Sequence, residues 1–301
     1  MKKGIRVVIC MAAVTAFVLC GVYLYGKRGN VDLQETVHEQ KYEEIDIKSR
    51  AALLIEEKSK QVLFSKNAKE RVYPASLTKL MTAVVAQEHT KNADEQVIVS
   101  SKVFGIIKGQ NASVAGFLPG ETVRMRDLYY GMLLPSGADA CLAAAEKVAG
   151  DEKRFVRLMN EKAKELGMEH TKFANVTGLH DASHYTTAED FMILFRYAIK
   201  NETIQKVITS KRYSVQATNK HPEGFTIKST LFQSIDEMGV ENSMILGGKT
   251  GYTTEAGLCL ASVAKSRDKT YLLITMGAEG KQEDGYRHIE DAQKIYQNFL
   301  P

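Results

Sequence analysis

Strand-like segments lie at both ends of residues 49–301, and helix-like segments fill the centre. Near the start, AALLIEE and QVLFSK flank the short polar segment KSK and are typical of two strands around a tight turn. Near the end, SMILGGKTGYT, GLCLASVAK and TYLLITMGA again have strand character, before a closing helix near GYRHIEDAQKIYQNFL. This order predicts one sheet assembled from both ends of the region, with a helical subdomain inserted beside it.

The central helices are predicted from the spacing of apolar residues. In SLTKLMTAVVAQEH these residues fall at positions 77, 80, 81, 84 and 85, which is one face of an amphipathic helix. The segments MRDLYYGMLL, GADACLAAAEKVAG, EKRFVRLMNEKAKELG and TAEDFMILFRYAIK continue the helical third. The chain has 301 residues, of which 44% are hydrophobic, and it is therefore long and apolar enough to bury a sizeable core.

The first 28 residues differ from the rest in charge. They contain Lys2, Lys3, Arg6, Lys27 and Arg28 and no acidic residue. The formal net charge of +4 therefore falls to −1 for the remainder, with 35 basic against 36 acidic residues. Nucleic-acid binding requires basic residues clustered on the folded domain, so we expect no nucleic-acid partner.

Residues 7–26 form an apolar run of 20 residues without a charge, which is roughly the length that spans a bilayer. A cleaved signal peptide normally has a shorter apolar region and a cleavage site between small residues. A lipoprotein needs a small residue before its cysteine, whereas Leu19 precedes Cys20 and Ile9 precedes Cys10. These features favour a segment that stays in the membrane.

We therefore interpret residues 1–28 as an uncleaved signal anchor, with residues 5–26 in the membrane, and a cleaved signal peptide as the alternative. Residues 29–48 are polar and charged and are interpreted as a linker. Residues 49–301 are then expected to form one domain. Its two cysteines, Cys141 and Cys259, lie in apolar stretches, which favours free buried thiols over a disulfide framework.

Ser76 and Lys79 form the motif S-x-x-K at the start of the helix predicted over 76–89. A spacing of three places both side chains on one helical face. A serine hydroxyl becomes a good nucleophile when a base accepts its proton, and a lysine can be that base if burial or a neighbouring cation lowers its pKa. By itself the motif is equally typical of an N-cap serine followed by an exposed lysine.

Two further motifs follow in the chain. S-G-A at 136–138 lies between two predicted helices, and K-T-G at 249–251 lies in a strand whose glycines let a ligand approach the backbone. Alone, K-T-G is typical of an exposed turn. The order S-x-x-K, S-G-x and K-T-G, with strand character only at the last, is the arrangement of serine penicillin-recognising enzymes.

With these motifs in place, residues 50–300 resemble the low-molecular-weight penicillin-binding proteins, which are serine D-alanyl-D-alanine carboxypeptidases. Longer strings carry the resemblance: PASLTKLMTA, DLYYGMLLPSGADAC, FVRLMNEKAKELGM, TKFANVTGL followed by HYTTAED, and GGKTGYTTEAGLCLASVA. The resemblance implies an α/β fold of the β-lactamase/transpeptidase-like class. That fold is an antiparallel sheet flanked by helices, plus a helical subdomain.

The resemblance also implies the catalytic roles. Ser76 is expected to be the nucleophile that forms an acyl-enzyme, and Lys79 the base that takes its proton. Ser136 is expected to pass a proton to the departing D-alanine amine. In this family the third residue of the second motif is usually asparagine, and Ala138 stands there instead. The loss of that amide puts the catalytic rate and the affinity for β-lactams in doubt.

The same resemblance implies the substrate-binding residues. Lys249 is expected to keep the catalytic lysine neutral and to orient the substrate, and Thr250 to bind its terminal carboxylate. Gly251 and Tyr252 complete the set of substrate-binding residues. The backbone N–H groups of Tyr252 and Ser76 are expected to form the oxyanion hole. Arg287 resembles the carboxylate-binding arginine of the family, and an exposed helix arginine is the alternative for it. No metal or organic cofactor is implied.

Three other functions remain to be weighed. A class A β-lactamase needs a glutamate in an E-x-x-L-N string, which is absent, so β-lactam antibiotics are expected to be inhibitors. A zinc peptidase is disfavoured because His180 and His184 lie in a loop and lack the glutamate of H-E-x-x-H. A catalytically weak penicillin-binding or wall-sensing protein is the third alternative, and Ala138 is its support.

We therefore expect a single-pass membrane protein whose catalytic domain is extracytoplasmic and removes the terminal D-alanine of the peptidoglycan pentapeptide. The residues do not distinguish ordinary wall trimming from cleavage of cross-links or from an accessory role in glycopeptide resistance.

Overall fold

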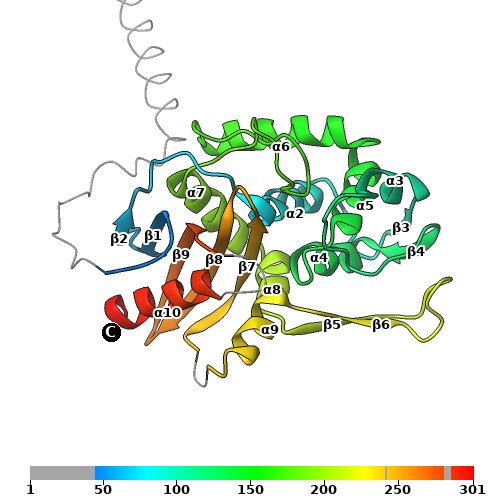
Figure 1. Ribbon diagram of the computed structural model, residues 1–301. Helices are drawn as coiled ribbons and strands as arrows, with labels where there is room; N and C mark the ends of the chain where they lie inside the picture. Colours follow the sequence, from blue (N-terminus) through cyan, green and yellow to red (C-terminus); the bar gives the residue numbers. More distant parts are fainter. Residues whose placement is uncertain (1–44, 241–242, 281–285) are drawn as a thin grey trace, which may run out of the picture. The chain divides into compact units, whose positions relative to one another are not determined.

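The computed structural model describes residues 45–240, 243–280 and 286–301 (Figure 1). The predicted anchor, residues 1–28, and most of the predicted linker lie outside this part of the chain. Ile47, at the end of the predicted linker, is buried in the core. Within the described residues, no helix combines the length and the apolar character that crossing a membrane requires.

Strands from both ends of the domain form its central sheet, as the sequence predicts. The sheet has five antiparallel strands in the order β2-β1-β9-β8-β7, and two two-stranded ribbons, β3-β4 and β5-β6, lie outside it. The strands are β1 (Ala51–Glu56), β2 (Val62–Lys66), β3 (Gln96–Val99), β4 (Glu121–Arg124), β5 (Arg212–Val215), β6 (Phe225–Lys228), β7 (Ile245–Thr253), β8 (Gly257–Ser266) and β9 (Lys269–Ala278).

Helices cover both faces of this sheet (Figure 1). They are the 3-10 helix η2 (Ala75–Thr78) and the α-helices α2 (Lys79–Glu88), α3 (Ser101–Ile107), α4 (Met125–Leu133), α5 (Ala138–Ala149), α6 (Glu152–Leu166), α7 (Ala188–Ile199), α8 (Glu202–Ile208), α9 (Thr230–Glu237) and α10 (Arg287–Phe299).

The alternation of side chains along β1 explains why both faces are covered. Successive residues of a strand point to opposite faces. Leu53 and Ile55 belong to the core shared with the helical part, whereas Ala52 and Leu54 belong to a second core against α10. All six residues of β1 are buried: the five apolar ones pack into these two layers, and the Glu56 carboxylate accepts hydrogen bonds from the Lys58 and Ser59 N–H groups.

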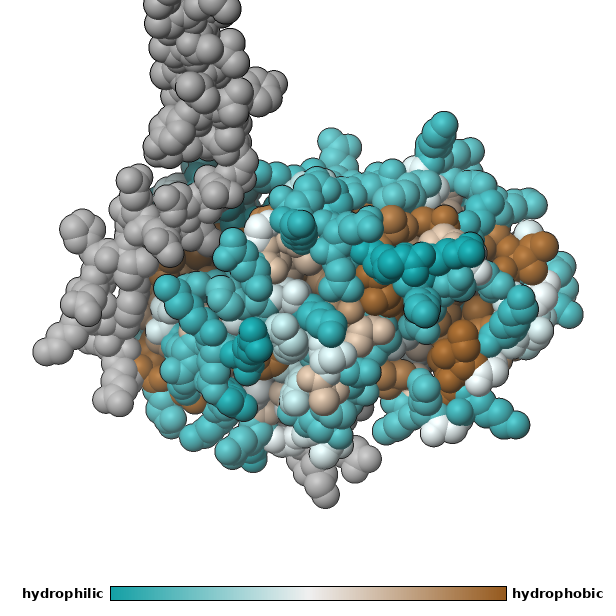
Figure 2. Space-filling model, turned by 90° about the horizontal axis from the view of Figure 1, so that it is seen from above, coloured by the Kyte–Doolittle hydropathy of each residue, from teal (hydrophilic) through white to brown (hydrophobic). Residues whose placement is uncertain are grey.

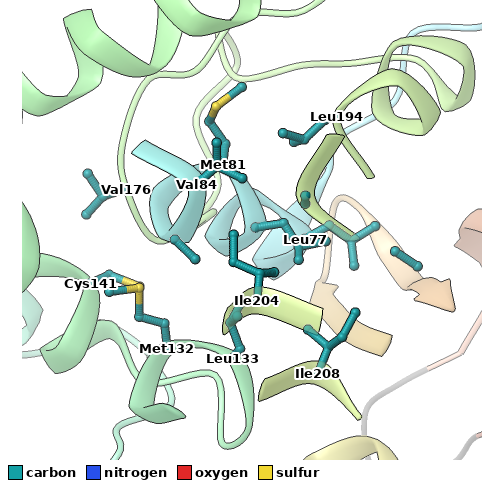
Figure 3. Close-up of a cluster of buried hydrophobic side chains, with 14 of the residues drawn as sticks. Leu77, Met81, Val84, Met132, Leu133, Cys141, Val176, Leu194, Ile204 and Ile208 are labelled. Carbon is teal, nitrogen blue, oxygen red and sulfur yellow. The ribbon is translucent and has the colours of Figure 1, made fainter. Parts of the chain in front are cut away.

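Helix α2 lies at the centre of the larger core (Figure 3). Its residues 79–86 are all buried, so it is not the one-sided amphipathic helix that the sequence predicts. The reason is that small residues, Thr82, Ala83 and Ala86, occupy the supposed polar face and let neighbouring helices pack closely. Cys141, on α5, lies in this core (Figure 3), and Cys259 is also buried. Both are free thiols, as predicted.

The short elements are those that the sequence does not predict, namely β3 to β6, α3, α8 and α9. A four-residue strand offers few positions for an alternating pattern. In β3, Val97 and Val99 are buried whereas Gln96 and Ile98 are exposed. The face in Figure 2 is mainly hydrophilic, with hydrophobic residues visible in places.

Candidate active site

The S-x-x-K motif brings its two side chains into direct contact. Ser76 lies in η2 and Lys79 is the first residue of α2. Lys79 Nζ donates to Ser76 Oγ at 2.8 Å and to the Thr177 carbonyl oxygen at 2.5 Å. A loop that lies about a hundred residues further along the chain therefore holds the amino group of Lys79 against the Ser76 hydroxyl. Lys79 is 3% exposed, which excludes the alternative of an exposed lysine.

Two buried lysines share this part of the domain. Burial lowers the pKa of Lys79, and burial together with the charge of Lys79 lowers the pKa of Lys249 well below its ordinary value. Lys249 lies behind the cleft surface, where its Nζ donates to the Thr250 carbonyl at 2.7 Å. Burial therefore favours the neutral amine of Lys79, which is the form that can accept a proton, whereas the repulsion between the two lysines lowers the pKa of Lys249.

Ser136 is held in a strained conformation beside the cleft. Its φ is +65°, in the left-handed region that non-glycine residues rarely adopt. Its Oγ is buried and has no hydrogen-bond partner among the described residues. Strained residues and unpaired polar atoms are concentrated at functional sites. Ala138 follows at the start of α5, and its side chain also lines the cleft.

Asp139 anchors the rim of the cleft and was not singled out from the sequence. Its carboxylate accepts hydrogen bonds from the backbone N–H groups of Ala115, Gly116, Phe117 and Ala140 at 2.8 to 3.2 Å. Burial raises its pKa, whereas these N–H groups favour the ionised form. The buried Asp139 side chain thus connects the S-G-A motif at 136–138 to the segment before β4.

Replacing Asp139 by alanine should destabilise the domain by at least about 3 kcal/mol, because several buried N–H groups lose their acceptor. It should also lower kcat/KM, since residues 111–113 of the anchored segment line the cleft. Chemical denaturation and steady-state kinetics measure both effects. Asp151→Ala, at the exposed N-cap of α6, is the control and should cost about 1 kcal/mol without a kinetic effect. Equal effects of the two substitutions would contradict the anchoring role.

The K-T-G motif lies on β7, which packs beside η2 at Gly251. A Cβ on Gly251 would lie 3.0 Å from the Ser76 nitrogen, so glycine allows this strand to approach Ser76 closely. Thr250 Oγ1 is 2.9 Å from Thr230 Oγ1, and the Thr230 hydroxyl in turn lies 3.2 Å from the Leu134 carbonyl oxygen. Thr230 was not predicted from the sequence. It orients the Thr250 hydroxyl, which is expected to bind the terminal carboxylate of the substrate.

These residues meet in one cleft with a volume of about 280 Å³. The cleft brings together Ser76, Lys79, Ser136, Thr250, Gly251 and Tyr252, which the sequence predicts, whereas Lys249 lies beneath it. Further lining comes from Asn111, Ala112, Ser113, Ala138, Thr177, Gly178, Leu179, His180, Thr230, Ser234, Thr253, Thr254, Glu255, Leu258, Tyr286 and His288.

Comparison with known proteins decides the family. Residues 34–280 match the family model described as D-alanyl-D-alanine carboxypeptidase. The chain belongs to this family. The D-alanyl-D-alanine carboxypeptidases DacF of Bacillus subtilis and DacC of Escherichia coli are 36% and 32% identical to it. Each alignment covers 80% of this chain, which spans 60% and 59% of the length of these two relatives.

The structural comparison agrees with the family assignment. The crystal structure of the Streptomyces K15 DD-transpeptidase matches with a TM-score of 0.76 and 28% identity, over 85% of this chain and 97% of the other. The predicted fold, an antiparallel sheet flanked by helices with a helical subdomain, is therefore confirmed.

Arg287 does not line the cleft. It is exposed at the start of α10, and its Nη1 donates to the Glu279 carbonyl at 3.0 Å. Its neighbours Tyr286 and His288 line the cleft instead. A sequence motif does not show which of these three side chains faces the cleft, because the direction of each side chain depends on how α10 packs.

His180 and His184 are separated by the fold. His180 lines the cleft and packs edge-on against Tyr73, with ring centroids 4.8 Å apart. His184 is buried, and its Nε2 is 2.9 Å from Thr78 Oγ1. Among the described residues, no three histidine, cysteine or acidic side chains gather as metal ligands would. His184 instead contacts the helical turn η2, which carries Ser76.

Acid should destabilise the folded domain through its buried histidines. Burial lowers the pKa of His184 and of His288 to about 4. Between the ordinary value near 6.5 and about 4, the unfolded chain binds protons that the folded chain does not, so stability falls as pH falls. Each histidine should contribute about 1.4 kcal/mol per pH unit within this window. Denaturation across the window should show a shallower pH slope for His184→Gln, and an unchanged slope would contradict the assignment.

Proposed function

We propose that this protein is a serine-type D-alanyl-D-alanine carboxypeptidase, which removes the terminal D-alanine of the peptidoglycan pentapeptide. The observation that carries the proposal is the 2.8 Å contact between Lys79 Nζ and Ser76 Oγ within the cleft. The names of the relatives support the same substrate class.

The proposed acylation begins when Ser76 Oγ attacks the carbonyl carbon between the two D-alanines and gives its proton to Lys79. The backbone N–H groups of Ser76 and Tyr252 stabilise the negative charge on the carbonyl oxygen. The bond to the terminal D-alanine then breaks, and the proton held by Lys79 passes through Ser136 to the departing amine, which leaves Lys79 neutral again. The Ser136 hydroxyl is suited to this relay, because its Oγ has no other partner among the described residues.

In the second half-reaction, water attacks the ester of Ser76 and gives a proton to Lys79, and the proton then returns to the serine. Among the described residues that line the cleft, Glu255 is the acidic one, and its carboxylate lies 3.9 Å from His180 Nδ1. We assign the base of both steps to Lys79, because its Nζ contacts Ser76 Oγ at 2.8 Å. We therefore propose that β-lactams acylate Ser76 and leave slowly, and so act as inhibitors.

The test is release of D-alanine from a peptide that ends in D-Ala-D-Ala. The wild-type protein should release it, and Ser76→Ala should not. Labelling by a fluorescent penicillin is a separate readout, which should also be lost in Ser76→Ala. Labelling of a wild-type protein that releases no D-alanine would overturn the proposed carboxypeptidase and favour the wall-sensing alternative.

We also propose that residues 5–26 attach the protein to the cell membrane, with the catalytic domain outside the cytoplasm. The uncharged run of 20 residues at positions 7–26 supports this location. A protein lacking residues 1–28 should appear in the soluble fraction of the cell. Its retention with the membrane would contradict the anchor.

A further inference from the structure

Strand β7 is the outer strand of the central sheet, and its free edge borders the cleft. In the part of the chain that the structure describes, β7 pairs with β8 alone. The edge of a sheet offers unpaired N–H and C=O groups, to which an extended peptide can add as a further strand. Residues 250–253 of β7 line the cleft. A peptide substrate can therefore lie along this edge.

The proposed reaction determines the direction of such a peptide. Its terminal carboxylate lies at Thr250 and its scissile carbonyl at the Tyr252 N–H, so the peptide is antiparallel to β7. In an antiparallel pair, two residues that face each other exchange both backbone hydrogen bonds. The penultimate D-alanine is then opposite Tyr252, and the residue before it is opposite Thr253. The side chain of that residue lies near the hairpin turn that joins β7 to β8.

Glu255 lies in this hairpin turn, and its carboxylate is available to a ligand. The side chain lines the cleft and is 44% exposed. Its Oε2 is 3.9 Å from His180 Nδ1, which is too long for a hydrogen bond. Among the described residues, Glu255 has no other polar contact. Both oxygens of the carboxylate can therefore accept hydrogen bonds from a bound molecule.

The charges at this end of the cleft favour a cationic ligand. Asp181 follows His180 in its loop, and the Asp181 carboxylate is exposed. Among the described residues that line the cleft there is no arginine, and the lysine is Lys79, which is buried against Ser76. A side-chain ammonium group that reaches the hairpin turn would thus meet a carboxylate. No lysine or arginine of the cleft lining would compete with it for that carboxylate.

We propose that Glu255 selects acyl donors in which the residue before the two D-alanines carries a side-chain ammonium group, as a diamino acid does. The Glu255 carboxylate pairs with that ammonium while Ser76 attacks the scissile carbonyl. This inference rests on the proposed carboxypeptidase function and adds to it the chemistry of the preferred peptide. A long side chain is required, because the ammonium must extend from the position opposite Thr253 to the hairpin turn.

The test compares Nα-acetylated tripeptides X-D-Ala-D-Ala, in which X is lysine, norleucine or glutamate. Norleucine has a straight side chain like that of lysine but no amine. For the wild-type full chain, kcat/KM for release of D-alanine should be about fivefold higher with lysine than with norleucine, the upper end for an ion pair that solvent reaches. It should be lowest with glutamate. The preference for lysine should decrease at high salt, because ions screen an exposed pair.

Variants of Glu255 assign the preference to this carboxylate. Glu255→Gln should remove the difference between the lysine and norleucine peptides, and Glu255→Lys should reverse the order and favour the glutamate peptide. Glu161→Gln, at an exposed position of α6, is the control and should keep the wild-type preference. The proposal would be overturned by a wild-type enzyme that does not distinguish lysine from norleucine, or by an undiminished preference in a folded Glu255→Gln protein.

Binding of the same peptides to the Ser76→Ala protein separates this proposal from the proposed function, because binding needs no turnover. The lysine peptide should bind more tightly than the norleucine peptide, and adding Glu255→Gln should abolish the difference. Equal binding of the two peptides to Ser76→Ala would overturn the role of Glu255. A wild-type protein that releases no D-alanine from any of the peptides would overturn the proposed function, and the binding comparison would still decide the role of Glu255.

Discussion

Lys79→Met should slow the acylation of Ser76 by about a thousandfold, within the range known for the loss of a general base. Methionine has nearly the same length and fits the buried site, but it cannot accept the serine proton. Burial lowers the pKa of Lys79, so folding disfavours the charged form of this amine. Removing that amine should leave the melting temperature equal or higher. Stopped-flow measurement of penicillin acylation, with thermal melting alongside, checks both expectations.

The pH dependence of the same reaction tests the lysine independently. Neutral Lys79 is the active form, so the acylation rate should rise with pH through its pKa, which lies below the ordinary 10.5. Lys164→Met, on the exposed side of α6, is the control and should keep both the rate and its pH profile. Wild-type acylation by Lys79→Met would remove the lysine from the mechanism, and a folded, inactive variant would support it.

Gly178→Ala should lower kcat/KM by about a hundredfold or more, the effect expected of moving a catalytic contact by about 1 Å. A Cβ at this position would lie 1.8 Å from the Ala75 carbonyl oxygen, so either the 177–179 loop or η2 must shift. Such a shift would pull the Thr177 carbonyl away from Lys79, which it contacts at 2.5 Å. Kinetics with the D-Ala-D-Ala peptide measure the loss of activity, and calorimetric melting measures the loss of stability.

Gly167 provides a matched control, because both glycines have a φ of +81°. A Cβ on Gly167, at the end of α6, has no atom within 4 Å, so Gly167→Ala adds backbone strain of roughly 1 kcal/mol without a clash. It should lower the melting temperature slightly and leave kcat/KM unchanged. Equal activity of the two alanine variants would show that close packing of residue 178 on η2 does not position the lysine.

Much of the cleft could be predicted because its chemistry lies in short contiguous motifs. Ser76 and Lys79 are three residues apart, and the spacing alone places them together on one turn. K-T-G was recognisable because it follows S-x-x-K and S-G-x in the order of serine penicillin-recognising enzymes. The sheet followed from strand-like apolar segments at both ends of the domain, since long buried strands such as β8 and β9 are nearly continuous apolar runs.

Other parts of the site depend on contacts between distant residues, which no local pattern records. Asp139 looks like an ordinary helix residue until its carboxylate meets the backbone of residues 115–117. Thr230 is unremarkable until it lies 2.9 Å from Thr250. The short ribbons β3-β4 and β5-β6 were missed because four residues are too few for a reliable alternation.

The order of the long strands and helices, the Ser76–Lys79 pair and the family were already readable in the linear chain. Apolar runs, a spacing of three residues and the order of three motifs, respectively, indicate them. Folding alone decided which side of α10 meets the cleft and therefore that His288, rather than Arg287, lines it. It also decided that both lysines are buried, which is what lowers their pKa values. The burial and the direction of a side chain arise from packing between segments far apart in sequence. Burial in turn lowers the lysine pKa values on which the proposed reaction depends.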